Sequence, residues 1–151
     1  MPGAIPVVSI AADGSYSSLD FGDDPSLEVD LIASIDHKLS MGKLAGFVMQ
    51  GLVPYGSTPS QARQALMLKA AFSGLPVAKV GRGAPEGFAD PHEFQIAGAN
   101  LTATKARLLL MACLLKFGSL PPAKNPDHPT SAELDAIRKA VAQYQKVFDT
   151  H

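Results

Sequence analysis

Three short apolar runs along the chain predict β-strands. They cover residues 5–10, 44–49 and 76–80, and the second run has no alternation of polar and apolar positions. Unbroken apolar runs of this length are typical of parallel strands that are covered on both faces. We therefore expect a parallel sheet with buried strands.

Apolar residues at helical spacing follow the first two of these runs. They predict helices over residues 25–39 and 59–72. Asp24-Pro25 and Thr58-Pro59 mark the two starts, because a capping side chain followed by proline suits the beginning of a helix. The connections between successive strands are therefore expected to be helical.

A third predicted helix contains the most apolar stretch of the chain, residues 108–115. Thr102 suits its N-cap, and Gly118 suits the left-handed position just after its last turn. Because nearly every side chain of the stretch is apolar, we expect this helix to have no solvent face and to form the centre of the core.

A last helix is predicted after a proline-rich linker. Residues 118–129 contain four prolines and cannot continue a helix. The next residues, Thr130 to Glu133, have the capping-box pattern, and they mark a new helix start. Its apolar stripe consists of Leu134, Ile137, Val141, Tyr144 and Phe148.

This order of elements predicts the α/β class. We expect one three-layer domain, Rossmann-like or flavodoxin-like, with a short, mainly parallel sheet of about four strands and helices on both faces. Residues 1–118 would form this domain. Residues 119–151 would be the linker and a C-terminal amphipathic helix that packs on it.

Composition narrows the possible partners and the compartment. The chain has 151 residues, 46% of them hydrophobic, and a formal net charge of −1, so no basic excess attracts nucleic acid or an anionic membrane. Its apolar runs are shorter than the roughly 20 residues of a membrane-spanning helix. The first residues lack the pattern of a signal peptide, and one cysteine cannot form an intramolecular disulfide. We expect a soluble, cytoplasmic protein with no nucleic-acid or membrane partner.

Residues with catalytic potential are few. The loop over residues 81–87 is glycine-rich, but its third glycine comes late for a dinucleotide-binding loop and Pro85 prevents the helix that would hold a pyrophosphate. Cys113 lies in the apolar helix, where a thiolate is poorly solvated. The four histidines lack metal-ligand spacing. We predict no catalytic residue, no metal and no cofactor in this chain.

Gly56, Ser57 and Thr58 are candidates for ligand contact. They lie where a predicted strand passes into a helix, at the edge where open α/β sheets bind ligands. An ordinary helix cap is the alternative, and caps are commoner than binding sites.

Lys105 and Arg107 stand in the first turns of the third helix, where the helix dipole disfavours cations. We expect a structural ion pair that ties this helix to the preceding loop. Its acidic partner would be Glu86, Asp90 or Glu93.

Residues 101–110 read Leu-Thr-Ala-Thr-Lys-Ala-Arg-Leu-Leu-Leu and follow Ile96-Ala97-Gly98. They resemble the Leu-Thr/Asn-Pro-x-Lys-Ala-Arg-x-Leu-Leu signature in the C-terminal domain of bacterial L-asparaginases and glutaminase-asparaginases. Residues 45–49 resemble the second strand of that domain, and residues 74–77 resemble its Gly-x-Pro-Val-Val strand. The resemblance covers residues 5–118.

The resemblance implies a domain without its own catalytic centre. In this family the catalytic threonines and the activating Asp-Lys pair belong to an N-terminal domain, within Thr-Gly-Gly-Thr and Thr-Asp-Thr-type motifs that this chain lacks. The C-terminal domain lends polar residues to a neighbouring subunit's site. Here the loop over residues 51–58 has no asparagine, so Thr58 would replace that amide, while Glu86, Asp90 or Glu93 would supply the acid. Arg82 stands where the Arg-Ser-Ser-Arg element of the family ends. Taken together with the position and charge arguments above, the candidate residues are Gly56, Ser57, Thr58 and Glu86 for ligand binding, and Arg82, Lys105 and Arg107 for structure.

Two functions are therefore expected. In the first, the chain contributes to L-asparagine amide hydrolysis only together with an N-terminal catalytic domain. In the second, it is a non-catalytic module that binds a small amino-acid ligand or assembles into oligomers. In both, a domain taken from a larger arrangement exposes an apolar patch, so we expect a homodimer.

Overall fold

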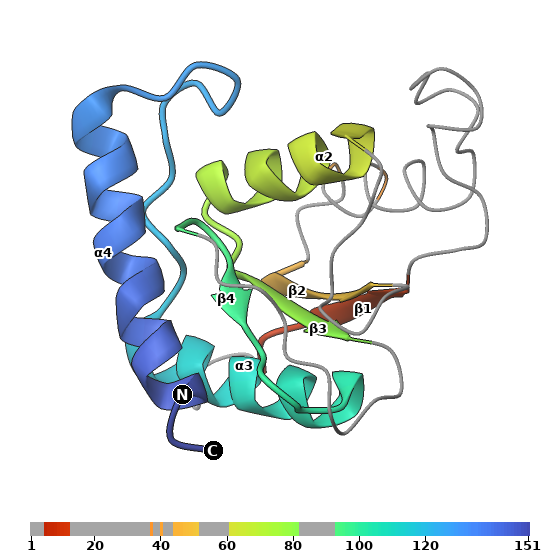
Figure 1. Ribbon diagram of the computed structural model, residues 1–151. Helices are drawn as coiled ribbons and strands as arrows, with labels where there is room; N and C mark the ends of the chain where they lie inside the picture. The colour runs from red at the N-terminus through yellow and green to blue at the C-terminus, as the bar shows by residue number, and fades with distance from the viewer. Residues whose placement is uncertain (1–4, 13–36, 38–39, 41–43, 52–60, 82–92) are drawn as a thin grey trace.

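The computed structural model describes residues 5–12, 37, 40, 44–51, 61–81 and 93–151 (Figure 1). One parallel sheet has the strand order β1-β2-β3-β4. The strands are β1 (Val8–Ala12), β2 (Gly46–Gly51), β3 (Val77–Gly81) and β4 (Ile96–Ala97). The helices of the described residues are α2 (Gln61–Phe72), α3 (Ala103–Phe117) and α4 (Ser131–Phe148). The predicted α/β class with a four-stranded parallel sheet is confirmed.

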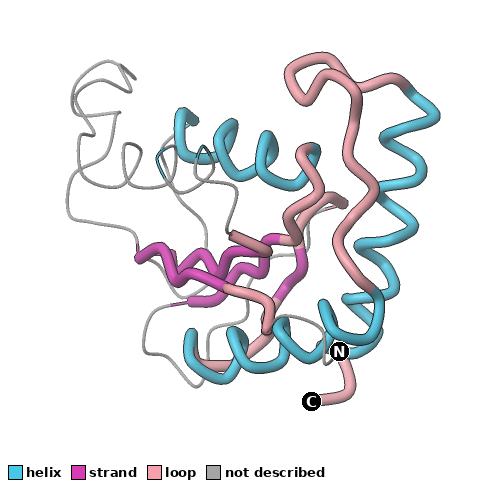
Figure 2. Tube along the Cα trace, turned by 180° about the vertical axis from the view of Figure 1, so that it is seen from behind, coloured by secondary structure: helices cyan, strands magenta, loops and turns pink. Residues whose placement is uncertain are grey.

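The strand register sorts side chains onto two faces of the sheet. Val48 pairs with Ile10 on one side and with Ala78 on the other, so these residues share a face, and α3 covers it (Figures 1 and 2). Phe47 and Val77 point to the opposite face, where they pack with Met67 and Ala70 of α2. Each face thus has its own apolar cluster, as expected for helices on both sides of a sheet.

Most predicted boundaries agree with the observed ones within a few residues. Strand β1 begins later than the apolar run suggests, and Ile5 and Val7 are exposed ahead of it. The predicted helix over residues 25–39 lies outside the described residues, apart from His37, which is helical.

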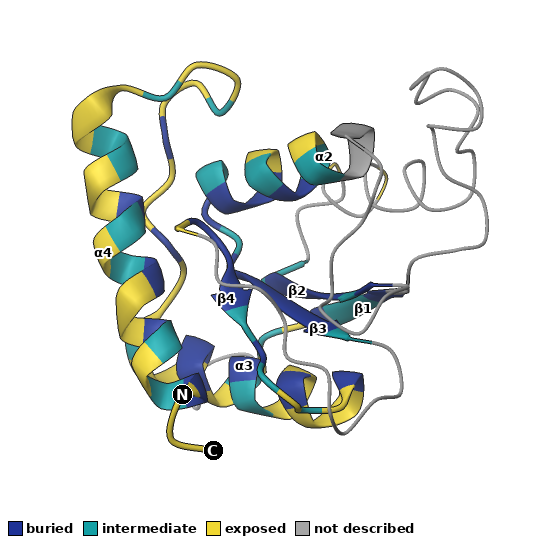
Figure 3. Ribbon diagram, in the orientation of Figure 1, coloured by how far each residue is buried: buried dark blue, intermediate teal, exposed yellow. Residues whose placement is uncertain are grey.

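Helix α3 begins and ends at the predicted residues, but its burial differs from the prediction. The Thr102 hydroxyl accepts a hydrogen bond from the Lys105 N–H, and Gly118 ends the helix with a φ of 78°. Leu108 and Leu115, however, are 62% and 66% exposed. Figure 3 shows exposed positions along one side of α3. The expectation of a helix without a solvent face is wrong, because the sheet and α4 cover only one side of it.

Strand β4 escapes prediction because two residues are too few to form a pattern. Its Ile96 pairs with Ala78 of β3, and the N–H of the next glycine, Gly98, donates to the Lys79 carbonyl at 2.8 Å. A Cβ on Gly98 would lie 2.6 Å from Val80 Cγ1 and 2.7 Å from the Lys79 oxygen. Glycine is therefore required for this close approach between the two strands.

Helix α4 closes the open edge of β4 with a side chain. The Ala97 N–H donates to Gln145 Oε1 at 2.8 Å, and Gln145 Nε2 donates to the Ala97 carbonyl at 3.1 Å. The same Nε2 also donates to Asp149 Oδ1 at 2.8 Å. The Gln145 amide thus takes the place that a neighbouring strand would occupy, and it satisfies the backbone groups of this edge.

Tyr144 joins α4 to the end of α3. Its hydroxyl donates to the Gly118 carbonyl, and its ring centroid lies 5.5 Å from that of Phe117. The side chain is buried. Burial raises the pKa of Tyr144 to about 12, with a further contribution from Cys113.

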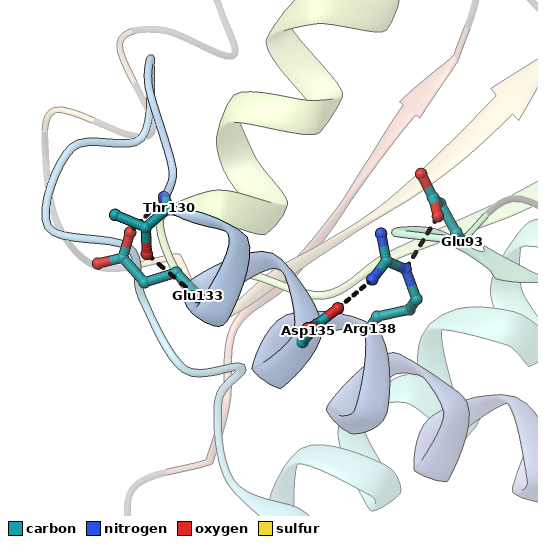
Figure 4. Close-up of polar contacts among 5 residues, drawn as sticks. All are labelled: Glu93, Thr130, Glu133, Asp135 and Arg138. Atoms are coloured by element: carbon teal, nitrogen blue, oxygen red, sulfur yellow. Dashed lines mark hydrogen bonds and ion pairs between the residues drawn. The ribbon is translucent and has the colours of Figure 1, made fainter.

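The linker after α3 is held by backbone hydrogen bonds to the end of α2. Leu120 N–H donates to the Gly74 carbonyl at 2.9 Å, and Ala123 N–H donates to the Phe72 carbonyl at 2.7 Å. Thr130 and Glu133 then form the predicted capping box of α4 (Figure 4). Residues 119–151 therefore contact the sheet, α2 and α3 through both the linker and α4.

We predict that Gln145→Leu lowers the free energy of unfolding by about 1–3 kcal/mol, because it leaves both Ala97 backbone groups without partners. Gln143 is exposed on the same helix, and Gln143→Leu is the matched control, with an expected change within about 0.5 kcal/mol. Urea denaturation measures both values. Equal effects of the two substitutions would contradict the role given to Gln145.

We also predict that the Tyr144→Phe variant loses less unfolding free energy at alkaline pH than the wild type does. The pKa of Tyr144 is raised from 10.0 to about 12 on folding. Its protonated form therefore stabilises the fold fully below pH 10, and this contribution is lost as the pH rises from 10 to 12. Between these pH values the wild type should lose about 1–2 kcal/mol more than the variant. Urea denaturation at pH 8, 10, 11 and 12 provides the comparison, and parallel curves would refute the prediction.

Candidate functional site

The carboxyl ends of β2 and β3 lie side by side. Gly51 is the last residue of β2, and it pairs in register with Gly81, the last residue of β3. Ligands bind at such carboxyl edges in open α/β sheets. The two chain segments that carry the predicted ligand-binding residues begin directly after these two glycines.

The predicted ligand-binding residues themselves lie outside the described residues, which exclude 52–60 and 82–92. This applies to Gly56, Ser57, Thr58, Arg82 and Glu86. Their roles stay predictions. The register of β2 and β3 fixes only the two points at which their segments leave the sheet.

Lys79 is a polar residue near this edge that the sequence did not single out. It lies on β3 two residues before Gly81, is 7% exposed, and pairs in register with Met49 and Ala97. Lys79 takes part in at least one interaction within the protein. A lysine within the apolar strand sequence Val77-Ala78-Lys79-Val80 was the available signal.

Gln95 is a second buried polar residue beside this strand. It directly precedes β4 and is 2% exposed, and its Nε2 has no hydrogen-bond partner within the described part of the chain. By the alternation of side chains along a strand, Gln95 lies on the same face as Ala97, and therefore on the face of Lys79. The two side chains thus share a face, but Gln95 comes before Ile96, which pairs with Ala78, and so lies level with the first residue of β3, at the amino edge of the sheet.

Glu93 forms its ion pair with Arg138 of α4. Arg138 Nε lies 2.9 Å from a Glu93 carboxylate oxygen, and Arg138 Nη1 lies 2.6 Å from Asp135 (Figure 4). The same guanidinium lies over the Phe94 ring, 5.1 Å from its centroid. Arg138 therefore fixes the chain just before β4 to the C-terminal helix.

Lys105 and Arg107 are both exposed on the first turns of α3. Neither makes an ion pair with a described acidic residue, and Glu93 pairs with Arg138 instead. Glu86 and Asp90, the other two predicted partners, lie outside the described residues. The loop-to-helix contact that the structure does describe is made by α4.

Cys113 is buried within α3. Burial raises the pKa of its thiol, and the smaller effect of Lys116 lowers it. A raised pKa disfavours the reactive thiolate. Among the residues described, no group of three or more His, Cys, Asp or Glu side chains is placed to hold a metal ion. None of the described helices has the length and apolar character needed to cross a membrane.

No protein-family model matches the sequence, and no curated protein matches it. The structure, however, is similar to that of a probable cytoplasmic L-asparaginase from Campylobacter jejuni, with a TM-score of 0.61 and 19% sequence identity. The fold is asparaginase-like. The match covers 97% of this chain and 38% of that enzyme's chain, so the asparaginase-like chain spans well under half the length of its structural neighbour.

We predict that Gln95→Leu raises the free energy of unfolding by about 1 kcal/mol. Leucine has a similar volume, and it removes a buried amide nitrogen that lacks a partner. Gln145→Leu at the other side of β4 should have the opposite sign, since that amide is hydrogen-bonded. Urea denaturation tests both variants together. Destabilisation by Gln95→Leu would contradict the unpartnered state of the Gln95 amide nitrogen.

Proposed function

We propose that this chain contributes to the hydrolysis of the L-asparagine amide only together with a separate catalytic domain. The supporting observation is the extent of the structural match, which includes nearly all of this chain but only 38% of the neighbouring enzyme. The Lys105-Ala106-Arg107 sequence at the start of α3 agrees with a domain of the C-terminal type.

The chemistry of amide hydrolysis explains why a second domain is needed. Acyl transfer requires a nucleophile, a base and oxyanion donors in one cleft. The sequence contains neither Thr-Gly-Gly-Thr nor Thr-Asp-Thr, and Cys113 is buried with a raised pKa. The catalytic groups would therefore come from the partner.

This chain would supply polar contacts to the substrate from the carboxyl edge of its sheet. The segments after Gly51 and Gly81 leave neighbouring strands, so one small molecule can contact both. A hydroxyl such as that of Thr58 is suited to a substrate carboxylate or amide, and a carboxylate such as that of Glu86 is suited to an ammonium group. In this proposal the chain orients the substrate and performs no covalent step.

A non-catalytic binding or assembly module is the second candidate. Leu108 and Leu115 favour it, because exposed leucines on one helix are typical of contact surfaces. In this case the chain keeps the asparaginase-like fold and binds an amino-acid ligand, or another chain, without contributing to hydrolysis.

We predict that the purified chain alone releases no ammonia from L-asparagine in a coupled assay. Ammonia release should appear when a chain that carries Thr-Gly-Gly-Thr, encoded beside it, is added. Thr58→Ala should then lower kcat/KM by about tenfold, the loss expected for one hydrogen bond to a charged group. Activity of the chain alone would refute the proposal.

A thermal-shift measurement with L-aspartate separates the two candidates. Stabilisation of the isolated chain by aspartate, with no activity in the mixture, would favour the binding module. Activity of the mixture without any effect of aspartate on the isolated chain would favour the contribution to catalysis.

A further inference from the structure

The solvent-facing side of α3 has an apolar centre. Leu108, Ala112 and Leu115 follow one another at intervals of four and three residues, which places them on one side of the helix. All three are exposed, whereas Ala106, Leu110 and Cys113 on the other side are buried. We call Leu108, Ala112 and Leu115 the outer stripe of α3.

Helix α4, by contrast, has no exposed leucine. Its large apolar residues are buried, as are Ile137, Val141 and Phe148, or partly buried, as are Leu134 and Val147. Its exposed positions carry polar residues or alanine (Figure 3). A single exposed apolar residue needs no explanation, but two leucines one above the other on a helix indicate a contact surface.

The charged residues of α3 itself all have one sign. Helix α3 contains no Asp or Glu, and its charged residues are Lys105, Arg107 and Lys116. All three are exposed, and none forms an ion pair with another described residue. In a symmetric dimer through this helix these cations would meet their own copies, and like charges at a contact are repulsive.

We propose that the outer stripe and its three cations bind another protein whose surface is apolar at the centre and rimmed by carboxylates. The leucines supply the area that becomes buried, and the cations select an acidic rim and accelerate the encounter. A lipid surface fits less well, because the stripe holds no aromatic residue and the chain as a whole has a net charge of −1. This inference holds whether or not the chain contributes to amide hydrolysis.

Two synthetic helical peptides are the probes. Both carry leucines at intervals of four and three residues, and they differ only in flanking positions that are Glu in one peptide and Lys in the other. Fluorescence anisotropy of labelled peptide reports binding to the full chain. At low salt the Glu peptide should bind at least about tenfold more tightly than the Lys peptide, and added salt should reduce the difference.

Variants of exposed residues test the surface without disturbing the core. Leu108→Gln combined with Leu115→Gln should weaken Glu-peptide binding by about tenfold or more. Lys105→Glu combined with Lys116→Glu should reverse the preference between the peptides. Ile5→Gln is the matched control, because Ile5 is a large apolar residue, 75% exposed, outside α3. It should leave binding unchanged.

Four results would overturn the proposal. The first is equal binding of the two peptides, and the second is no binding of either. The third is a dimer in sedimentation that Leu108→Gln dissociates, because this would identify a second copy of the chain as the occupant. The fourth is tighter binding to phosphatidylserine vesicles than to the Glu peptide, with the same dependence on Leu108, which would identify a membrane.

Discussion

The hydrogen bonds at the outer edge of β4 connect the sheet to the C-terminal helix α4. A strand of two residues has little stability of its own, and its outer backbone groups need partners. Gln145 provides both partners from a helix that begins more than thirty residues after β4 ends. The position of β4, the start of α3 at Ala103 and the docking of α4 therefore depend on one another. Arg138 and Tyr144 add further contacts along the same helix, one before β4 and one after α3.

Local signals in the sequence predict the helix ends at which unpaired backbone groups require a capping residue. Thr102, Gly118 and Thr130 mark helix ends correctly, because a cap satisfies groups within one turn of itself. Strand β4 and the burial of α3 could not be predicted in this way. Both depend on neighbours distant in sequence: β4 exists through its pairing with β3, and α3 is exposed where no element packs on it. An apolar composition does not say how many sides of a helix are covered.

The candidate site could be predicted as a position but not as a set of contacts. The order of strands and loops places the segments after β2 and β3 at one edge of a parallel sheet, and the pairing of Gly51 with Gly81 agrees with this. Lys79 and Gln95 were missed because their burial depends on the folded arrangement of the strands, which no short motif records. Sequence and fold are only loosely related here, because the fold is similar to that of an asparaginase at 19% sequence identity.

The pairing of Gly51 with Gly81 also has an evolutionary consequence. Neighbouring strands of a sheet are spaced about 4.8 Å apart, so the two chain segments that follow paired residues leave the sheet side by side whatever their sequences are. Insertions and substitutions in either segment can change its chemistry without disturbing the buried register behind it. A fold of this kind can lose one activity and acquire another binding specificity at the same place, while its core residues remain under the same packing constraints.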